Sequence, residues 1–257
     1  MGAMEGRALA IETRDLRKVY GDKAAVSGLN LAVPAGSFFG FLGPNGAGKT
    51  TTIRVLAGLA PPTAGDIRLL GLPLAGHAIE IKKQVGVVPD QSFLFDHLTG
   101  AEFLEFAGRM YGLERSVVRE RARELLGLFE LDGAGGKLIA DYSKGMRKRL
   151  EMGAALIHRP RLFLLDEPFE GVDAVGARVM KKLLEEQVRA GATIFLTSHV
   201  LEVVERLCDR VAVIHEGKLV LEGEMAALAG GSQTLEDVFV RVVGLERPAP
   251  ALRWLQE

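Results

Sequence analysis

The sequence predicts an α/β fold: a parallel sheet flanked by helices, preceded by an antiparallel β region and interrupted by an inserted helical region. Two continuous apolar runs, 162–166 and 193–198, are typical of strands buried on both faces of a parallel sheet. Residues 8–42 have the short apolar runs and turns of β structure. Residues 99–158 instead have apolar side chains at helical spacing. We therefore expect a layered domain with two smaller additions.

Each element has a local signal. Thr99 is a candidate N-cap, and Glu216-Gly217 between two apolar runs indicates a hairpin. The side chains of Phe103, Phe106 and Met110 recur at helical spacing, and we expect them to pack in the core. The expected strands are 8–16, 26–33, 37–42, 65–71, 85–89, 162–166, 193–198, 211–215 and 218–221, and the expected helices are 51–59, 100–111, 117–131, 174–190, 225–230 and 234–243.

Composition excludes several classes of protein. The chain has 257 residues, 48% of them apolar and 25% charged, with a formal net charge of −1. That balance is typical of a globular protein and gives no electrostatic reason to expect a nucleic-acid partner. The single cysteine, Cys208, excludes an intrachain disulfide and a cysteine-based zinc site, and favours a reducing compartment. No apolar run is long enough to span a membrane, and the first residues do not form a signal peptide.

The most informative segment is Gly43–Thr50, which reads Gly-Pro-Asn-Gly-Ala-Gly-Lys-Thr and matches the phosphate-loop pattern in full. A buried strand precedes it and a helix follows, which is the setting of a P-loop NTPase core and makes a chance glycine-rich turn the weaker interpretation. Lys49 would contact the terminal phosphates, and the Thr50 hydroxyl would bind Mg²⁺. The nucleotide-binding positions in this segment are Gly43, Pro44, Asn45, Gly46, Ala47, Gly48, Lys49, Thr50 and Thr51.

Two acidic residues end the apolar strand at 162–166. Asp166 is placed to hold Mg²⁺, and Glu167 to orient and deprotonate the attacking water. The alternative is a polar strand end with two solvated carboxylates. His199 ends the next strand, where ligand contacts collect in parallel sheets, and could contact a γ-phosphate oxygen and the water. A surface histidine is the alternative there. His77, His97, His158 and His215 have no such setting and are expected to be structural or exposed.

Ser143 and Gly145 precede a basic helix, at a position where a helix N-terminus could receive an anion. By itself this segment is an ordinary helix start. It gains meaning from the order of the motifs along the chain.

In that order the sequence closely resembles the ATP-binding subunits of ABC transporters over residues 9–243. Gly43–Thr50 matches Walker A, 162–167 matches Walker B with the catalytic glutamate, and 142–146 stands at the signature motif. Gly171-Val-Asp173 resembles the D-loop, and His199 the switch histidine. Tyr20 stands where the family has an aromatic residue that stacks on adenine, although a turn tyrosine is the alternative.

The resemblance implies a division of the chain and two partners. It implies a RecA-like core plus β subdomain at 8–91 and 159–223, a helical subdomain at 92–158, and short helices and a tail at 224–257. A second nucleotide-binding subunit would pair head to tail, as a homodimer or heterodimer, so that Ser143 and Gly145 bind the γ-phosphate in trans. A membrane permease subunit would dock near 90–98, and the chain would lie peripherally on the cytoplasmic face of the cell membrane.

The sequence departs from the family in two motifs, at Asp90 and, in the signature, at Lys144 and at Met146, which replaces a glutamine. Asp90 stands where a glutamine commonly senses the γ-phosphate and metal, and Gln91 follows it; we expect Asp90 to take this role, in contact with Mg²⁺ or the water. Lys144 replaces a signature glycine and could add positive charge near the phosphate across the interface. These features, with Leu235–Phe239, resemble the ATPase subunits of bacterial exporters, and the segment after the predicted hairpin is too short for the regulatory β-domain of many importers.

We therefore expect an ATPase that uses Mg²⁺ and drives export of an unidentified substrate through a separate membrane subunit. Two alternatives stay open at this point. One is a soluble ABC ATPase that does not serve transport, although such proteins usually have two cassettes or a long coiled coil. The other is a catalytically weak partner in a heterodimeric transporter, which Glu167 and His199 argue against.

Overall fold

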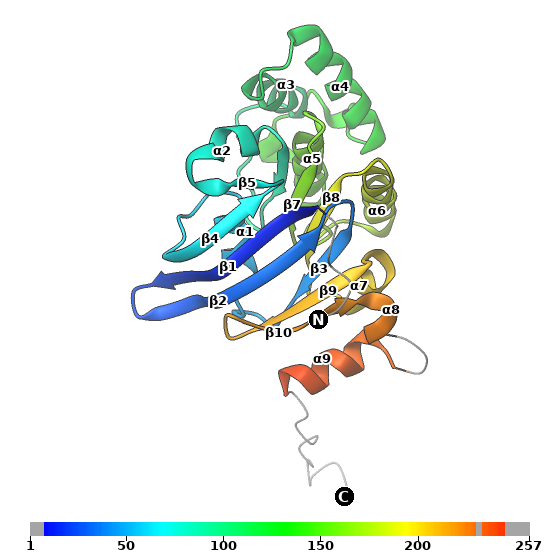
Figure 1. Cartoon of the computed structure of the whole chain (residues 1–257). Helices are drawn as coiled ribbons and strands as arrows, with labels where there is room; N and C mark the ends of the chain where they lie inside the picture. Colours follow the sequence, from blue (N-terminus) through cyan, green and yellow to red (C-terminus); the bar gives the residue numbers. More distant parts are fainter. Residues whose placement is uncertain (1–7, 230–232, 245–257) are drawn as a thin grey trace, which may run out of the picture.

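The computed structural model describes residues 8–229 and 233–244, which form two sheets and a set of helices (Figure 1). The strands are β1 (Leu9–Tyr20), β2 (Lys23–Pro34), β3 (Phe38–Leu42), β4 (Ala64–Leu69), β5 (Leu72–Pro73), β6 (Val85–Val88), β7 (Leu162–Asp166), β8 (Thr193–Thr197), β9 (Arg210–His215) and β10 (Lys218–Glu224). The predicted α/β class is confirmed.

The helices are α1 (Lys49–Leu56), α2 (Leu74–Lys82), α3 (Gly100–Met110), α4 (Arg115–Leu128), α5 (Lys144–Leu156), α6 (Ala174–Arg189), α7 (Leu201–Leu207), α8 (Met225–Leu228) and α9 (Leu235–Val243), with short 3₁₀ turns at Asp132–Ala134 and Ile139–Asp141. None of these helices is long and apolar enough to cross a membrane. The tail expected at the end of the chain, from 245 onwards, lies outside the described residues.

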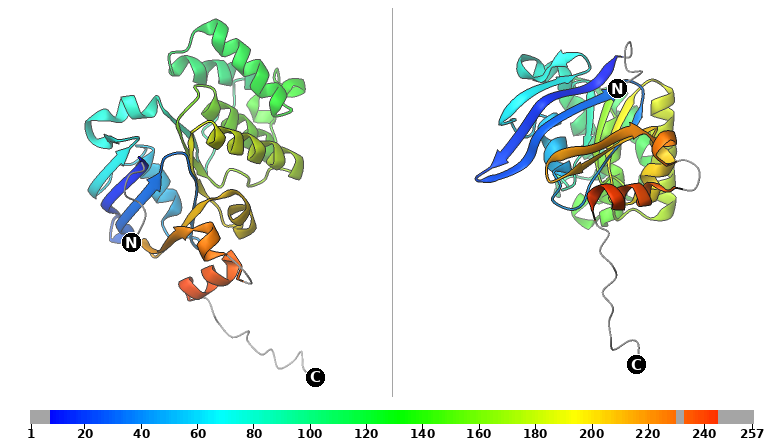
Figure 2. Two further views of the ribbon diagram at one scale, coloured as in Figure 1. Left: turned by 45° about the vertical axis from the view of Figure 1, so that its right-hand side comes forward. Right: turned by 60° about the horizontal axis from the view of Figure 1, so that its bottom comes forward.

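The six-stranded sheet has the order β10-β9-β3-β8-β7-β6, and its strands are parallel except for β10, which pairs antiparallel with β9. The four-stranded sheet, β2-β1-β4-β5, is antiparallel. Figure 2 shows this second sheet on one side of the six-stranded sheet and helices α5 and α6 on the other. The antiparallel β region and the parallel sheet were both expected from the sequence.

The six-stranded sheet separates two hydrophobic cores, because successive side chains of a strand point to opposite faces. In β3, Phe39 and Phe41 pack with α1 and the antiparallel sheet, whereas Phe38 and Leu42 pack with the helices of the other face. In β8, Phe195 belongs to the first core. All five of these side chains are at most 2% exposed, so the strands that end at the predicted motifs are rigidly held.

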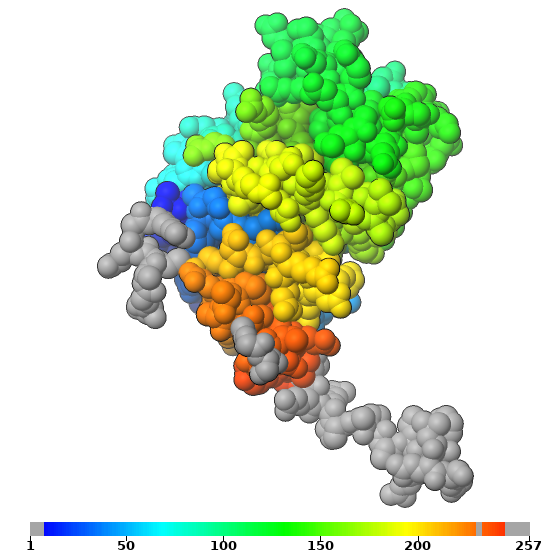
Figure 3. Space-filling view, turned by 90° about the vertical axis from the view of Figure 1, so that its right-hand side faces the viewer, coloured from blue at the N-terminus to red at the C-terminus, as the bar shows by residue number. Residues whose placement is uncertain are grey.

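The helical region packs as α3, α4 and α5 against one another, with α5 also resting on β6. It forms one end of the molecule, and α9 lies at the other end (Figure 3). The predicted cap is confirmed, since the Thr99 Oγ1 accepts a hydrogen bond from the Glu102 N–H at 3.2 Å.

The core role expected for the aromatic stripe of α3 is wrong at two of its three positions. Phe106 is 42% exposed and Met110 is 71% exposed, and only Phe103 packs against the core. The ring of exposed Phe95 lies 6.0 Å from the Phe103 ring and 5.3 Å from the Phe106 ring, edge to face in both pairs. The stripe therefore belongs to an aromatic cluster that reaches the surface.

Candidate functional site

Most of the predicted site residues follow four neighbouring parallel strands, in the order β3, β8, β7 and β6. Tyr20 instead ends β1, and Ser143 and Gly145 lie at the start of α5. Because the carboxyl ends of parallel strands lie at one edge of a sheet, the segments that follow them converge there. They enclose a pocket of about 570 Å³. Its lining residues are Tyr20, Lys23, Ala25, Asn45, Gly46, Gly48, Lys49, Thr50, Thr51, Asp90, Asp166, Glu167, Glu170 and His199.

The phosphate loop is shaped by its glycines. Gly46 and Gly48 have φ values of 79° and 115°, which glycine adopts at little steric cost. A Cβ on Gly48 would lie 2.5 Å from the Ala25 carbonyl oxygen, and one on Gly43 would lie 2.3 Å from that of Ile214. The loop therefore needs glycine both for its conformation and for its close approach to neighbouring strands. Helix α1 begins at Lys49, so its N-terminus faces the pocket.

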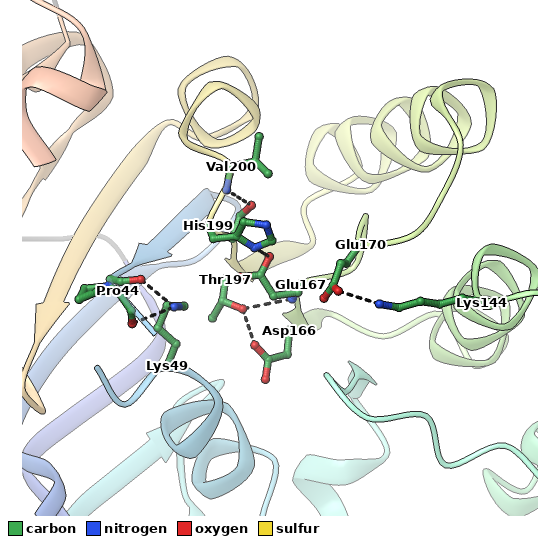
Figure 4. A network of polar contacts seen from close by, with 11 residues as sticks. Pro44, Lys49, Lys144, Asp166, Glu167, Glu170, Thr197, His199 and Val200 are labelled. Carbon is green, nitrogen blue, oxygen red and sulfur yellow. Dashed lines mark hydrogen bonds and ion pairs between the residues drawn. The ribbon is translucent and has the colours of Figure 1, made fainter. Parts of the chain in front are cut away.

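The Lys49 ammonium is held inside the loop. Its Nζ donates to the Gly43 carbonyl at 2.7 Å and to the Pro44 carbonyl at 3.3 Å (Figure 4). Burial lowers the pKa of Lys49, while the negative charges of the pocket carboxylates Glu167, Asp166 and Asp90 oppose that shift. The cation is thus positioned at the base of the pocket, where an anionic ligand would replace its contacts to neutral carbonyls.

The Asp166 carboxylate is buried at the end of β7 and is bound by the neighbouring strand. The Thr197 hydroxyl of β8 donates to Asp166 Oδ1 at 2.5 Å, and the side chain of Asp166 is almost fully buried. Burial raises the pKa of this carboxyl, while hydrogen bonding from Thr197 and Thr50 and the charge of Lys49 lower it. The Asp166 carboxylate therefore lies beside Thr50, in the first turn of α1.

Glu167 forms the other half of the acidic pair. Its Oε2 lies 2.9 Å from His199 Nδ1, and its N–H donates to the Thr197 hydroxyl at 3.2 Å. Its backbone has a φ of 47°, in the left-handed region that costs a non-glycine residue energy. This conformation turns Glu167 away from the buried strand and toward His199, whose side chain is 57% exposed. The Glu167 carboxylate and the His199 ring are thus paired at the pocket.

The donor set also fits Mg²⁺. The Thr50 hydroxyl and the Asp166 carboxylate are oxygen ligands of the kind this ion prefers, and both line the pocket beside the phosphate loop, as does Asp90. Among the described residues there is no group of three or more His, Cys, Asp and Glu side chains arranged to hold a metal on their own. The arrangement suits an ion that is bound jointly by the protein and by phosphate oxygens.

Comparison with known proteins agrees with this geometry. The family model for ABC transporters matches residues 26–170. The linearmycin resistance ATP-binding protein LnrL of Bacillus subtilis is 35% identical over 88% of this chain and 74% of its own length. The Nod factor export ATP-binding protein I of Cupriavidus metallidurans is 40% identical over 83% of this chain and 71% of its own length.

This chain belongs to the ABC transporter family, as an ATP-binding subunit. A solved structure of an ATP-binding subunit of an ABC transporter has a TM-score of 0.85 at 30% identity, covering 91% of this chain and 99% of that one. The protein is an ATPase.

The structure of the ABC subunit brings most, but not all, of the predicted site residues together. Tyr20 lies at the pocket and is 48% exposed, with the Lys18 ammonium 4.8 Å from the centroid of its ring. Asp90 lines the pocket, whereas Gln91 lines a small hollow beside it. Ser143 and Gly145 do not line the pocket of their own chain.

These two signature residues have local structural contacts instead. The Ser143 hydroxyl caps α5 by accepting from the Met146 N–H at 3.2 Å. A Cβ on Gly145 would lie 2.7 Å from the Gly171 carbonyl oxygen, so the signature segment packs closely on the D-loop. Their binding role in trans stays a prediction.

Three residues that line the pocket were missed by sequence reasoning, namely Lys23, Ala25 and Glu170. Thr197, whose hydroxyl contacts Asp166, was missed as well. Thr197 lies two residues before His199, so its position at the strand end was the available signal. Glu170 pairs with Lys144, whose Nζ lies 2.7 Å from Glu170 Oε1, and this contact holds the pKa of Glu170 below its usual value. The lysine at the family's glycine position therefore has a partner within the same chain.

Proposed function

We propose that this ATPase is the energy-supplying subunit of a bacterial exporter and acts on the cytoplasmic face of the cell membrane through a separate permease subunit. The pocket that unites the phosphate loop with Asp166, Glu167 and His199 carries the proposal, because it brings together groups that bind phosphate and groups that activate water. Export is supported by the names of two relatives, a Nod factor export protein and a linearmycin resistance protein. Since those cargoes differ, the transported substrate is left open.

ATP binding is assigned to the loop and the aromatic rim. The loop N–H groups and the N-terminus of α1 surround the phosphates, and Lys49 exchanges its carbonyl contacts for the terminal phosphates. Tyr20 stacks on the adenine from the β1–β2 turn. Mg²⁺, when bound through Thr50 and Asp166, would screen the phosphate charge; Asp90 is assigned to the same phosphate and metal region.

Hydrolysis is assigned to the acidic pair and the histidine. Glu167 orients the attacking water and takes its proton, and His199 fixes the Glu167 carboxylate while its ring also reaches toward the γ-phosphate. Thr197 holds both acids, since one hydroxyl contacts the Asp166 carboxylate and the Glu167 N–H. The buried strand behind them limits their motion and so keeps the site in one geometry.

A second copy, or a similar subunit, is proposed to complete each site. Ser143 is exposed and lies away from the pocket of its own chain, which suits a residue that binds the γ-phosphate of a facing subunit. Gly145, close behind it, offers an N–H in the first turn of α5. Closure on ATP and opening after hydrolysis would then move the attached permease.

The permease is proposed to dock on the helical subdomain, 92–158, beside the core formed by 8–91 and 159–223. A docking groove of about 210 Å³ lies there, lined by Leu59, Val87, Pro89, Phe93, Leu94, Phe103, Glu151 and Ala154. Phe93 is 62% exposed and Phe95 is 50% exposed at its edge. Adjacent exposed aromatic side chains of this kind mark a surface that another protein covers, rather than one that stays in contact with solvent.

The test is ATP turnover by Glu167→Gln, which keeps the size of the side chain but removes the base. We expect hydrolysis to fall by at least about 100-fold while ATP still binds, since general-base catalysis is worth that order. The measurement is steady-state phosphate release together with the affinity for ATP. Turnover equal to that of the wild type would contradict the assignment of Glu167.

A further inference from the structure

Lys18 is a half-buried lysine that has no part in the hydrolytic site. It lies two residues before the end of β1, and its Nζ donates to the Pro61 carbonyl at 2.8 Å. The same Nζ lies 4.8 Å from the centroid of the Tyr20 ring. An ammonium within about 6 Å of an aromatic centroid is attracted by the electrons of the ring face. One side chain thus contacts both the loop after α1 and the aromatic ring at the pocket.

The end of β1 that carries both side chains is fixed to the loop after α1. The Thr63 N–H donates to the Arg17 carbonyl at 2.8 Å, and the Val19 N–H donates to the Thr63 hydroxyl at 3.0 Å. Together with the contact between Lys18 and Pro61, these hydrogen bonds hold the strand end against the loop. The Lys18 ammonium therefore has a defined place, which a solvated lysine at a strand end would lack.

The pairing of the strands does not by itself orient the Tyr20 ring. Tyr20 is the last residue of β1 and pairs with Lys23 across a tight turn, and the pairing with β2 shifts register between Lys18 and Val19. Such irregularities increase the local twist and re-aim side chains. The ring is also 48% exposed, so packing fixes it only in part. Its direction therefore depends on side-chain contacts, and the Lys18 ammonium supplies one.

We propose that Lys18 is a positioning residue for the adenine base, because its ammonium covers one face of the Tyr20 ring and leaves the opposite face for the base. This inference rests on the proposed function, in which Tyr20 stacks on adenine, and it adds the residue that orients the stack. Tyr20 and Lys23 line the pocket, whereas Lys18 does not. The ammonium therefore approaches the ring from outside the pocket, and a base would approach it from within.

The cation would also strengthen the stack. The face of an aromatic ring is rich in electrons, which is why two rings avoid a direct face-to-face arrangement. A cation on the far face of Tyr20 draws ring electrons away from the base and lowers this repulsion. Since the Lys18 Nζ is held by the Pro61 carbonyl, it acts on the ring and not as a further ligand of the phosphates.

The experiment measures the affinity of the full chain for ADP by calorimetric titration, because ADP carries the base and is not consumed. Lys18→Gln keeps a donor for the Pro61 carbonyl but removes the charge, and Lys18→Arg keeps both. We expect the affinity to fall about threefold in Lys18→Gln and to stay at the wild-type value in Lys18→Arg. Arg17→Met removes an exposed cation one residue earlier and is the matched control, which should bind ADP like the wild type.

Pyrophosphate separates the stack from a general attraction for phosphate. It matches the phosphates of ADP but has no base, so its affinity should be the same for the wild type and for Lys18→Gln. If Lys18 acts by attracting phosphate, both ligands will bind more weakly to Lys18→Gln. If it acts only through its hydrogen bond to Pro61, Lys18→Gln will bind ADP like the wild type. Either result overturns the proposal.

A double-mutant cycle with Tyr20→Ala completes the test. Loss of the ring should weaken ADP binding about tenfold, the usual order for one stacked base. Adding Lys18→Gln to Tyr20→Ala should weaken it no further, because the cation then has no ring to act on. A Lys18→Gln effect that persists without the ring overturns the proposal.

The two proposals fail in different ways. If Tyr20→Ala binds ADP like the wild type, the proposed stacking role of Tyr20 fails, and the role of Lys18 fails with it. If Tyr20→Ala binds ADP more weakly but Lys18→Gln binds it like the wild type, only the role of Lys18 is overturned.

Discussion

The ATP pocket and the docking groove differ in how their polar groups are satisfied. In the pocket, Asp166 binds Thr197, Glu167 binds His199 and Glu170 binds Lys144, so every one of these acids has a partner within the chain. In the groove, Phe93 is exposed, and among the described residues the Glu151 Oε1 has no hydrogen-bond partner of good geometry. The pocket acids are therefore positioned by contacts within one subunit, whereas the groove leaves apolar side chains exposed at the surface.

The two regions also differ in what holds them. The pocket acids follow strands whose side chains are fully buried, and the groove is formed by helix surfaces and the segment after β6. Lys148 connects them, through its contacts with the carbonyls of Pro89 and Asp90. Substitutions in the pocket should therefore change ATP binding and hydrolysis, and those in the groove should change assembly.

The largest effect is expected in the pocket, from Lys49→Ala. Losing the ammonium removes charge-assisted hydrogen bonds to phosphate, and we expect the affinity for ATP to fall by at least about 100-fold. Isothermal titration calorimetry with ATP measures it. Lys83→Ala, which removes an exposed lysine outside the pocket, is the control. Unchanged affinity in Lys49→Ala would show that the phosphate loop does not bind the nucleotide in the manner described.

A smaller effect is expected from Thr197→Val. This substitution tests whether hydrogen bonds within the chain position the pocket acids for catalysis. The substitution keeps the shape of a fully buried side chain but removes the hydroxyl that contacts both acids. We expect kcat to fall about tenfold with little change in KM, because positioning rather than binding is lost. Thr193→Val, at the other end of the same strand, loses only a hydrogen bond from the Gly36 N–H and should leave kcat unchanged. If both substitutions lowered kcat equally, the lower kcat would reflect a less stable fold rather than a loss of positioning of the acids.

The helical region should respond to acid in a way that the pocket does not. Burial lowers the pKa of His158, at the end of α5, to about 4, although its Nε2 contacts the Val85 carbonyl at 3.2 Å. Its ring stacks on Tyr111 with centroids 3.5 Å apart. Because the unfolded chain takes up this proton near pH 6.5, stability is lost as the pH falls from about 6.5 toward 4.

Allowing for partial exposure of the ring, we expect a loss of about 1 kcal/mol in the free energy of unfolding between pH 7 and pH 5. Urea unfolding at the two values measures it. His158→Phe, which keeps the stack on Tyr111 without a titrating group, should reduce the difference by that amount. A variant with the same pH dependence as the wild type would assign the acid sensitivity to other groups.

The smallest effect is expected from the exposed pair at the border of the two regions. Lys144→Met leaves the Glu170 carboxylate uncompensated beside the phosphates, and we expect the KM for ATP to rise about threefold at low salt. The double variant Lys144→Met/Glu170→Gln should restore it. If the double variant binds ATP no better than the single one, the pair does not act through charge.

Much of the pocket could be predicted from the sequence because its chemistry depends on the order of residues at strand ends. Gly43–Thr50, Asp166, Glu167 and His199 all follow apolar strands, and parallel strands place their carboxyl ends together. Thr197 was not recognised, because a threonine inside a buried strand looks the same whether its hydroxyl faces a core carbonyl or a catalytic acid. Contacts between strands decide this, and they are not local in sequence.

The family resemblance placed a docking surface near 90–98, but the part of the groove formed by α3 could not be predicted, for a related reason. Phe103, Phe106 and Met110 have the spacing of a core-facing stripe, and an apolar stripe that faces a partner protein has the same spacing. Helices α2 and α7 were also missed. The first has non-helical backbone angles at 75–77, and the second is only seven residues long and packs where Gly40 leaves room for Val204. Short elements of this kind depend on tertiary packing more than on local pattern.

The central claim is that one chain holds half of a hydrolytic site and a second chain completes it. The most direct measurement is the mass of Glu167→Gln in solution with Mg²⁺ and ATP, compared with Glu167→Gln/Ser143→Arg. We predict a dimer for the first with ATP, a monomer with ADP, and a monomer for the second even though ATP remains bound. A monomeric Glu167→Gln with ATP, or a dimer that persists when Ser143 is replaced, would contradict the account.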